Sequence, residues 1–512
     1  MHPHLRLITK RGRLSVLLAL ILLLAFLALL NQRGAAVGLQ NPFRYGKLQQ
    51  GSEVLTALPE LAASSRPEQQ TPEPEFCTPR FSPDYLYGLR DRAIQYCSPA
   101  STPSAAAANL TCFHSRTQDR DDAFCFAQGA VLDPSTKTFN LDCDVRLPTA
   151  NESSRGIIPF TGIRGYWYDT GPGVLFQKYV KVANRSSASS TPEQIQPRPS
   201  QARPIISILL KREGAWNIWH SLMELWSMTM SLDVLRMAPD PAVPTKPFFH
   251  IPADTPRTQV VFLDDHPEGP LYPLWGMFAG REPVRLADIL KDPARSRALA
   301  ETPQSLVIPL AGSSNPTWMN DWVERDCKDA PLMRLFTQRV MHHCGVVQET
   351  GPRPTEVLNV TLIDRRGTRK LLNQDALLYA ARAKFPGVNF QTFDFAALPF
   401  PDQLRIVQST DVLVGVHGAA LTHTMFLREG GAAVVEIQPS SMSYKGFRNM
   451  AQMRGQAYVS AHAEMFGAED RVDRRRNLAK RHRWQWVDVR IEEDQFLQLI
   501  TEAIESLPGR GT

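Results

Sequence analysis

Residues 411–439 read DVLVGVHGAALTHTMFLREGGAAVVEIQP, and their pattern indicates the class of fold. Two apolar runs, Val412–Val416 and Ala432–Ile437, enclose a turn at Gly415–Gly418 and a segment of small residues, Ala419–Leu427. A strand, a glycine turn, a helix and a second strand make up the βαβ unit of a doubly wound sheet. We therefore predict parallel strands over both apolar runs.

The turn inside this unit predicts an anion-binding site. Gly415 and Gly418 allow a tight turn and the close approach of a ligand to the backbone. The first N–H groups of the next helix, at Gly418–Ala420, have no partner within the helix and suit a diphosphate. His417 lies at the carboxyl end of a strand, where such sheets bind their ligands. A glycine turn alone is weak evidence for a nucleotide site.

The same alternation precedes this unit. Apolar runs at 357–363 and 388–393 predict strands, and residues 371–385 and 400–409 predict helices. Four strands alternating with helices indicate a parallel sheet covered on both faces. The loop after the first of these strands, residues 364–370, reads DRRGTRK. Five charges in seven residues commonly mark a solvated loop, but a guanidinium fork at this place would suit a diphosphate.

The string VLVGVHGAALTHTMFL followed by AAVVEIQP resembles the signature of glycosyltransferase family 61. That family includes EGF-domain-specific O-GlcNAc transferases and plant xylan xylosyl- and arabinosyltransferases. The resemblance is strongest over residues 355–439, looser over 205–320, and absent from the first 75. It implies an α/β fold with two Rossmann-like domains facing a cleft (GT-B type), of which the second binds a nucleotide sugar.

The resemblance also implies a donor site without a metal or cofactor, because an Arg-rich loop of the family binds the donor and Arg365, Arg366 and Arg369 match it. Glu436, at the end of its strand, could bind the donor ribose or only terminate that strand. The candidate donor-binding residues are Arg365, Arg366, Arg369, Gly415, His417, Gly418, Ala419, Ala420 and Glu436.

An apolar run near the start of the chain predicts a membrane anchor. Leu14–Leu30 is uninterrupted except for one Ser and reaches the short end of the roughly 17–25 residues that span a bilayer. The basic residues before it should stay cytoplasmic. We predict a signal-anchor at 14–30 after a tail at 1–13, with a cleaved signal peptide as the alternative. The protein would then be a single-pass type II protein of the Golgi or endoplasmic reticulum membrane with a luminal catalytic part.

Composition divides the remaining chain. Residues 31–75 are rich in Gln, Pro, Glu and Ser and predict a stem. We assign 76–350 to an N-terminal, acceptor-side domain with a low-complexity loop at 186–204, and 351–512 to the nucleotide-sugar-binding domain. The net charge of +6 includes four basic residues of the tail, so the chain is not a nucleic-acid binder by charge.

Seven cysteines in a luminal protein predict disulfides and one free thiol. Five lie between Cys77 and Cys143, and we expect Cys327 and Cys344 to pair with each other. Neither Cys nor His spacing fits a zinc site.

Four sequons should behave differently. Asn109, Asn151 and Asn184 lie in polar surroundings that predict surface loops. Asn359 lies in a predicted interior strand and should carry no glycan.

The N-terminal domain supplies the candidate catalytic residues. After a predicted strand at 205–210, the segment GAWNIWHSLMELWSMTM has helical periodicity. Asn217, His220 and Glu224 form a polar stripe on this helix. Spacing alone favours a solvated stripe, but the family contains similar Asn-x-x-His-x-x-x-acid segments, with Asp common where this chain has Glu224. The catalytic base is therefore expected to be His220 or Glu224.

Other polar and aromatic residues have weaker roles. Asp264 and Asp265 end a predicted strand, but adjacent acids point to opposite sides of a strand and are unlikely to chelate one ion. We expect a turn or an acceptor contact there. Trp318 and Trp322 could stack on a sugar ring, although core packing is the commoner fate of Trp.

These features together predict an inverting, metal-independent glycosyltransferase. A UDP-sugar donor, UDP-GlcNAc or UDP-xylose, would transfer its sugar to a hydroxyl of a glycan or glycoprotein in the secretory pathway. Alternatives are an inactive luminal sugar-binding or scaffold protein of the same fold and a metal-dependent transferase of the single-Rossmann type. A serine hydrolase is disfavoured because His417 occupies the turn where a nucleophile elbow needs Ser.

Overall fold

Two large β-sheets carry the fold in the computed structural model, and both belong to the unit formed by residues 53–512. The structure describes residues 73–97, 108–117, 120–183, 205–241, 243–319, 321–467 and 484–509. The predicted tail, anchor and nearly all of the stem lie outside these residues, as do the loop 186–204 and Asn184. No helix in the described ranges is long and apolar enough to cross a membrane.

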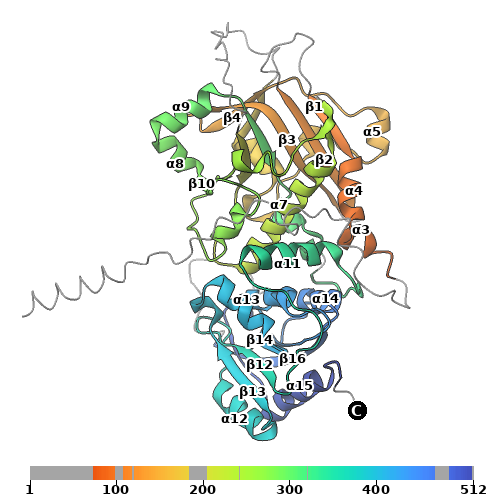
Figure 1. The fold of residues 1–512 in the computed structure, drawn as a ribbon, viewed down its shortest axis with the longest axis vertical. Helices are drawn as coiled ribbons and strands as arrows, with labels where there is room; N and C mark the ends of the chain where they lie inside the picture. Colours follow the sequence, from red (N-terminus) through yellow and green to blue (C-terminus); the bar gives the residue numbers. More distant parts are fainter. Residues whose placement is uncertain are drawn as a thin grey trace, which may run out of the picture. The chain divides into compact units, whose positions relative to one another are not determined.

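The first sheet combines antiparallel and parallel strands (Figure 1). Its strands follow the order β1-β2-β3-β11-β6-β9-β10, and β4 pairs with β3 and β5. Strands β6, β9, β10 and β11 are parallel, whereas β1, β2 and β3 extend the sheet in antiparallel fashion beyond β11. The strands are β1 (Ala93–Cys97), β2 (Asn109–Thr117), β3 (Arg120–Asp133), β4 (Thr138–Asp142), β5 (Val180–Ala183), β6 (Ile206–Leu210), β9 (Thr258–Phe262), β10 (Val284–Arg285) and β11 (Gln304–Ile308).

The parallel part of this sheet has a switch point. In sequence β6 comes first and β11 last, yet the two are neighbours, with Ile208 opposite Val307. After β6 the chain continues to β9 and β10 on one side and then crosses back to β11 on the other, so the strand order reverses between β6 and β11 and a crevice opens at their carboxyl ends. The loops at that crevice are residues 211–214 and 311–314.

Helix α7 (Ile218–Met237) follows β6 and is buried on nearly every side. Of the predicted polar stripe, Glu224 is buried, whereas Asn217 is exposed and His220 is half-buried. Asn217 is the N-cap, whose side chain accepts hydrogen bonds from the backbone N–H groups of Trp219 and His220. A helix that is apolar all round needs neighbours all round. The second sheet supplies part of that cover, because α7 packs against the helical segment η9 (Ala419–Phe426).

The second sheet confirms the parallel arrangement predicted from the sequence. Its order is β13-β12-β14-β15-β16-β17, and only the β16–β17 pair is antiparallel. The bounds are β12 (Leu358–Ile363), β13 (Val388–Phe393), β14 (Val412–Val416), β15 (Ala433–Pro439), β16 (Ala457–Phe466) and β17 (Asp488–Arg490). Because β14 lies on the opposite side of β12 from β13, the switch point falls between β12 and β14.

Helices cover both faces of this sheet, as predicted. Val412 and Val414 face a cluster completed by α12 (Gln374–Lys384) and α15 (Glu493–Glu505). Leu413 points to the other face, which is covered by α13 (Phe400–Gln408), α14 (Gly446–Met453) and η9. Figure 1 shows α12 and α15 together on one side of the sheet and α13 and α14 on the other.

One continuous buried cluster extends from the first sheet to the second. It contains Ile208 of β6, Trp226 of α7, Phe336 of α11 (Pro331–His343) and Leu413 of β14. The Trp226 and Phe336 rings are stacked with centroids 5.5 Å apart. The two sheets are thus joined by apolar packing through α7, α11 and η9.

The disulfides differ from the expected pairing. Cys77 bonds to Cys327, so the predicted Cys327–Cys344 bridge is wrong, and Cys344 is the free, buried thiol. One free cysteine out of seven was expected, and this is confirmed. The other bridges are Cys97–Cys143 and Cys112–Cys125.

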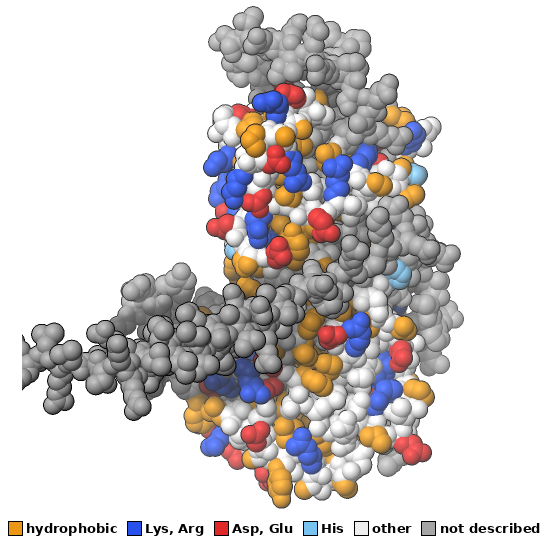
Figure 2. All heavy atoms as spheres, turned by 60° about the vertical axis from the view of Figure 1, so that its left-hand side comes forward, with side chains coloured by type: hydrophobic (Ala, Val, Ile, Leu, Met, Phe, Trp, Pro, Cys, Tyr) orange, Lys and Arg blue, Asp and Glu red, His pale blue; other side chains and the backbone are white. Residues whose placement is uncertain are grey.

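The surface carries no segregated charge on the side shown in Figure 2. Basic, acidic and apolar side chains are intermingled over its described part.

Candidate active site

The loops after β12 and β14 meet at the switch point of the second sheet. Nη1 of Arg369 donates to the carbonyl oxygen of His417 at 3.1 Å. Gly418 has φ = 155°, which L side chains rarely adopt, and a Cβ there would lie 2.6 Å from Nη1 of Arg365. The same Cβ would lie 3.1 Å from Nη1 of Arg369. Glycine at 418 therefore makes room for two guanidinium groups that converge on the turn.

Neither of these two guanidinium groups has a counter-ion among the residues that the structure describes. Within the described residues no carboxylate forms an ion pair with Arg365 or Arg369, and Nε of Arg365 donates only to the Thr368 carbonyl. Nε of Arg369 is buried without a hydrogen-bond partner. Burial lowers the pKa of both side chains, and burial together with the adjacent Arg365 charge lowers the pKa of Arg369 to about 9. Two partly desolvated cations side by side call for an anion.

Arg366 takes a different position. Its side chain is 75% exposed and pairs with Asp364. Of the three arginines predicted to bind the donor, Arg365 and Arg369 converge on Gly418, whereas Arg366 is mostly exposed and lines the cavity beside this turn.

A cavity of about 330 Å³ lies beside this turn. Arg365, Ala419 and Ala420 line it, as do Trp216 and Ile218 from the region before and at the start of α7. Its volume is at the lower end of the range for small-molecule sites. The cavity is also lined by Asp364 and Asp394, which follow the neighbouring strands β12 and β13. Asp394 was not among the predicted site residues, although its place directly after a predicted strand was a usable signal.

His417 is held by a buried carboxylate. Its Nδ1 lies 2.6 Å from Oε1 of Glu436, and the hydroxyl of Tyr458 donates to Oε2 of Glu436 at 2.5 Å. Glu436 is fully buried and both of its oxygens are engaged, so this carboxylate is placed to orient His417 rather than to meet a ribose. Burial lowers the pKa of His417, and the Glu436 carboxylate partly opposes this effect.

Gly415 does not form part of the turn. Strand β14 continues through Val416, and a Cβ at Gly415 would lie 3.1 Å from Cδ2 of Leu421 and 3.3 Å from Cδ1 of Ile363. A larger residue there would need Leu421 and Ile363 to shift by a few tenths of an ångström, so packing favours glycine. The segment after the turn, expected to be a helix, is the 3₁₀ helix η9.

The crevice of the first sheet brings together three titratable side chains. Nδ1 of His220 lies 2.9 Å from Oε2 of Glu213, and the backbone N–H of Glu213 donates to Oε1 of Glu224 at 2.9 Å. A Cβ on Gly312 would lie 2.6 Å from Cγ of Glu224, so the loop after β11 closes over this carboxylate. Glu224 is 4% exposed. It therefore fixes the loop that carries Glu213, whereas the His220 ring remains partly exposed.

The protonation of the two acids differs from that of exposed carboxylates. Burial raises the pKa of Glu224 well above its usual value, and the Glu213 charge adds to this effect. Burial also raises the pKa of Glu213, while His220 partly offsets it. Sequence reasoning did not select Glu213, which follows β6 by three residues at the carboxyl end of a parallel strand.

The remaining candidates have structural partners. Asp264 forms a buried ion pair with Arg212, with Nη2 and Oδ1 2.8 Å apart, and also accepts the Arg212 backbone N–H. Trp318 contacts the His220 ring, with centroids 4.6 Å apart, and Trp322 is 56% exposed.

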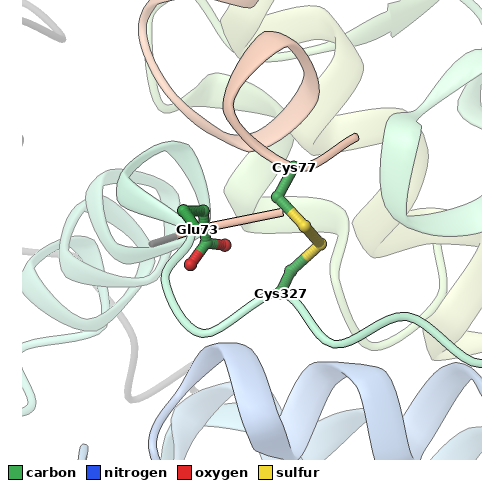
Figure 3. Close-up of side chains that lie close together, drawn as sticks. All are labelled: Glu73, Cys77 and Cys327. Atoms are coloured by element: carbon green, nitrogen blue, oxygen red, sulfur yellow. A yellow bond between two sulfur atoms is a disulfide. The ribbon is translucent and has the colours of Figure 1, made fainter. Parts of the chain in front are cut away.

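A cluster of potential metal ligands outside this site does not fit a metal. Glu73, Cys77 and Cys327 lie together in Figure 3, but the two sulfur atoms are bonded to each other. Oε1 of Glu73 accepts the backbone N–H of Lys328 at 3.0 Å. The cluster is therefore a disulfide bond beside a carboxylate that accepts a backbone hydrogen bond.

The chain is similar to known proteins over a segment that includes part of the second sheet. Residues 277–435 match the family model described as Glycosyltransferase 61. The EGF domain-specific O-linked N-acetylglucosamine transferase of Mus musculus is 36% identical over 135 residues, which are 26% of this chain and 25% of that protein. The protein of the same description from Drosophila melanogaster is 24% identical over 255 residues, 49% of this chain and 44% of that protein. The matches thus span a quarter to less than half of these relatives. The matched segment contains the arginine loop and the turn at Gly418, and residues 277–435 form a glycosyltransferase family 61 domain.

Proposed function

We propose that the protein is an inverting glycosyltransferase that uses a UDP-sugar, UDP-GlcNAc or UDP-xylose, and transfers the sugar to a hydroxyl of a glycan or glycoprotein. The observation that carries this proposal is the pair of guanidinium groups of Arg365 and Arg369 over Gly418, without a carboxylate partner in the described chain. The family 61 domain supports it, as do the printed descriptions of relatives as O-linked N-acetylglucosamine transferases.

The donor would lie against the second sheet. Its diphosphate fits the two guanidinium groups and the first N–H groups of η9, and its nucleoside fits the adjacent cavity of about 330 Å³. Asp394 is the carboxylate best placed for the ribose. As the bond between the sugar and UDP breaks, negative charge grows on the diphosphate, and fixed cations stabilise that charge in the transition state. This arrangement would need no divalent metal ion.

The base would come from the first sheet. Nε2 of His220 takes the proton of the acceptor hydroxyl while the acceptor oxygen attacks C1 from the face opposite UDP, and UDP leaves with the electron pair. Glu213, whose Oε2 lies 2.9 Å from Nδ1 of His220, stabilises the imidazolium that forms. Glu224 would act only through Glu213, as a positioning residue.

We place this chemistry in a GT-B arrangement of two Rossmann-like parts, 76–350 and 351–512. The signal-anchor at 14–30, the stem at 31–75 and a luminal location in the Golgi or endoplasmic reticulum belong to the same proposal.

The test is release of UDP by the purified full-length chain. A panel of UDP-sugars should identify one donor whose turnover depends on an added glycan or glycoprotein, and turnover should persist in excess EDTA. Loss of turnover in EDTA would contradict the metal-free mechanism. Donor binding without any turnover would instead identify a sugar-binding or scaffold protein of this fold.

A further inference from the structure

A short, strained loop lies beside the His220–Glu213 pair. Tyr168 and Asp169, within the segment η3 (Trp167–Asp169), both have positive φ, 60° and 58°. Two consecutive non-glycine residues in the left-handed region cost free energy, and such strain concentrates at functional sites. The loop therefore has a conformation that packing alone did not require.

Several contacts hold this conformation. The backbone of Tyr166 pairs with that of Thr170, and Oγ1 of Thr170 donates to the Trp167 carbonyl at 2.9 Å. Asp169 forms ion pairs with Lys178 at 2.5 Å and with Lys211 at 3.3 Å. Lys211 directly follows β6, so the loop is fixed to the crevice of the first sheet.

The loop presents aromatic rings to solvent. Trp167 is 75% exposed and Tyr168 is 57% exposed. The Tyr168 ring makes an edge contact with His220, with centroids 5.1 Å apart. Tyr and Trp side chains are enriched at interfaces where one end is apolar and the other meets water, so exposed rings beside a polar site indicate a binding surface.

Aromatic exposure is concentrated around this site. The described chain has six strongly exposed aromatic residues. Two are Trp167 and Tyr168. Trp216 lies at the cavity, and the Trp322 ring is 5.3 Å from that of Tyr444, which contacts His417.

We propose that residues 166–170 form the acceptor subsite and that Trp167 and Tyr168 stack on a sugar ring, so that the acceptor is a glycan. This inference rests on the proposed transfer reaction. A pyranose has a flat C–H face, which buries apolar area against an aromatic ring, and a rim of hydroxyls, one of which would reach His220.

The loop is poorly suited to a bare polypeptide. Peptides in extended form bind through free backbone edges. Here the carbonyls of Trp167, Tyr168 and Thr170 accept hydrogen bonds from the Thr170 hydroxyl, Lys211 and the Tyr166 N–H, respectively. The aromatic faces are what the loop leaves available.

Binding of oligosaccharides to the full-length chain tests the proposal. Xylotetraose and chitotetraose are the probes, and saturation-transfer NMR and the acceptor KM are the measurements. Trp167→Ala should raise the Kd or KM of the bound probe at least tenfold, and Trp167→Phe less than threefold. Tyr168→Gly removes the second ring without backbone strain and should act in the same direction. UDP affinity and Tm should not change.

Tyr379→Ala is the matched control, because Tyr379 is a 78% exposed tyrosine on α12. An effect of Trp167→Ala no larger than that of this control overturns the proposal. So does a wild-type chain that binds neither probe but glycosylates a sugar-free polypeptide. A wild-type chain that binds a probe through Trp167 but turns over no UDP-sugar would contradict the transferase and still support the sugar subsite.

Discussion

Arg365 and Arg369 lie next to each other at a turn where one acid would have relieved their repulsion. The described chain places its acids elsewhere: Asp364 pairs with the exposed Arg366, and Glu436 is engaged by His417 and Tyr458. The buried positive charge is therefore left for a ligand, and its free-energy cost is offset when an anion binds.

Replacing Arg369 with Ala should weaken UDP binding about 10- to 100-fold. Hydrogen bonds to charged groups contribute about 1.5–3 kcal/mol, and each 1.4 kcal/mol is a factor of ten. Isothermal titration with UDP is the measurement. Arg405→Ala is the control, because this arginine of α13 is 51% exposed, pairs with Asp402 and does not line the cavity, so the Kd should change by less than threefold. Wild-type affinity in Arg369→Ala would remove this residue from the donor site.

UDP affinity should also fall at high pH. The pKa of Arg369 is lowered to about 9 in the free protein, so below that pH the cation is already present. Above that pH, the neutral Arg369 side chain must take up a proton before UDP binds. The affinity for UDP should therefore decrease by up to tenfold per pH unit. Titrations between pH 7.5 and 10 should show a plateau followed by this decline, and Arg369→Ala should lack it. A flat profile in the wild type would contradict the role of an easily neutralised guanidinium.

Single residues were harder to assign from the sequence than the site as a whole. Arg365, Arg369 and His417 were selected because each follows a predicted strand, and the structure brings them together. Glu436 was selected for the same reason, yet its side chain points into the protein. Glu213 was missed because its relation to His220 depends on how the loop after β6 folds back over α7, a distance in space that spacing along the chain does not encode.

Strands could be predicted from the sequence where every residue of the strand is buried. Strands β12, β14 and β15 are buried on both faces and are apolar runs in the sequence. Strand β16 was not predicted, because its residues are mostly half-exposed and form no apolar run. The antiparallel strands β2 and β3 were also missed, and with them the fact that Asn109 begins a strand and is 8% exposed, so the surface loop expected there is wrong.

Strand β12 leads to a prediction about glycosylation. It is an interior strand, and Nδ2 of Asn359 donates to the Ser409 carbonyl at 2.8 Å while its Oδ1 accepts from Asn389 at 2.9 Å. A glycan on Nδ2 would prevent this pairing, so folded, active protein should carry none at Asn359. Asn109 donates to Gln128 and should be unoccupied for the same reason.

Glycopeptide mass spectrometry of active protein measures this directly. Asn151 is the internal comparison, because it is exposed on the short helix α5 (Ala150–Ser154) and should be the occupied site of the three. Substantial occupancy at Asn359 would show that the β12–β13 edge is open.

At the scale of the whole molecule, the sequence did not reveal that the two sheets share a core. The polar stripe predicted on α7 suggested that one side of this helix meets water. In the structure η7 (Gly312–Ser314) and η9 pack against α7, and the Leu310 N–H donates to Oγ of Ser231 at 3.0 Å, so Ser227, Thr229 and Ser231 are buried as well. Small polar residues on a helix predict solvent exposure unless the packing partners are known, and these partners lie much farther along the sequence.

The Cys77–Cys327 disulfide should stabilise this shared architecture more than the other bridges. It closes an interval of 250 residues, compared with 13 for Cys112–Cys125. In the chain-entropy model these intervals correspond to about 5 and about 3 kcal/mol, because a longer loop loses more freedom in the unfolded chain. The double variant Cys77→Ser/Cys327→Ser should therefore have a lower Tm than Cys112→Ser/Cys125→Ser. Cys344→Ser, which breaks no bridge, should lie closest to the wild type.

Double variants are needed because a single one would leave a thiol free to exchange. Calorimetry under non-reducing conditions, with peptide mapping of the remaining bridges, gives the ranking. A Tm of the Cys77→Ser/Cys327→Ser variant equal to that of Cys344→Ser would show that this bridge does not constrain the unfolded chain.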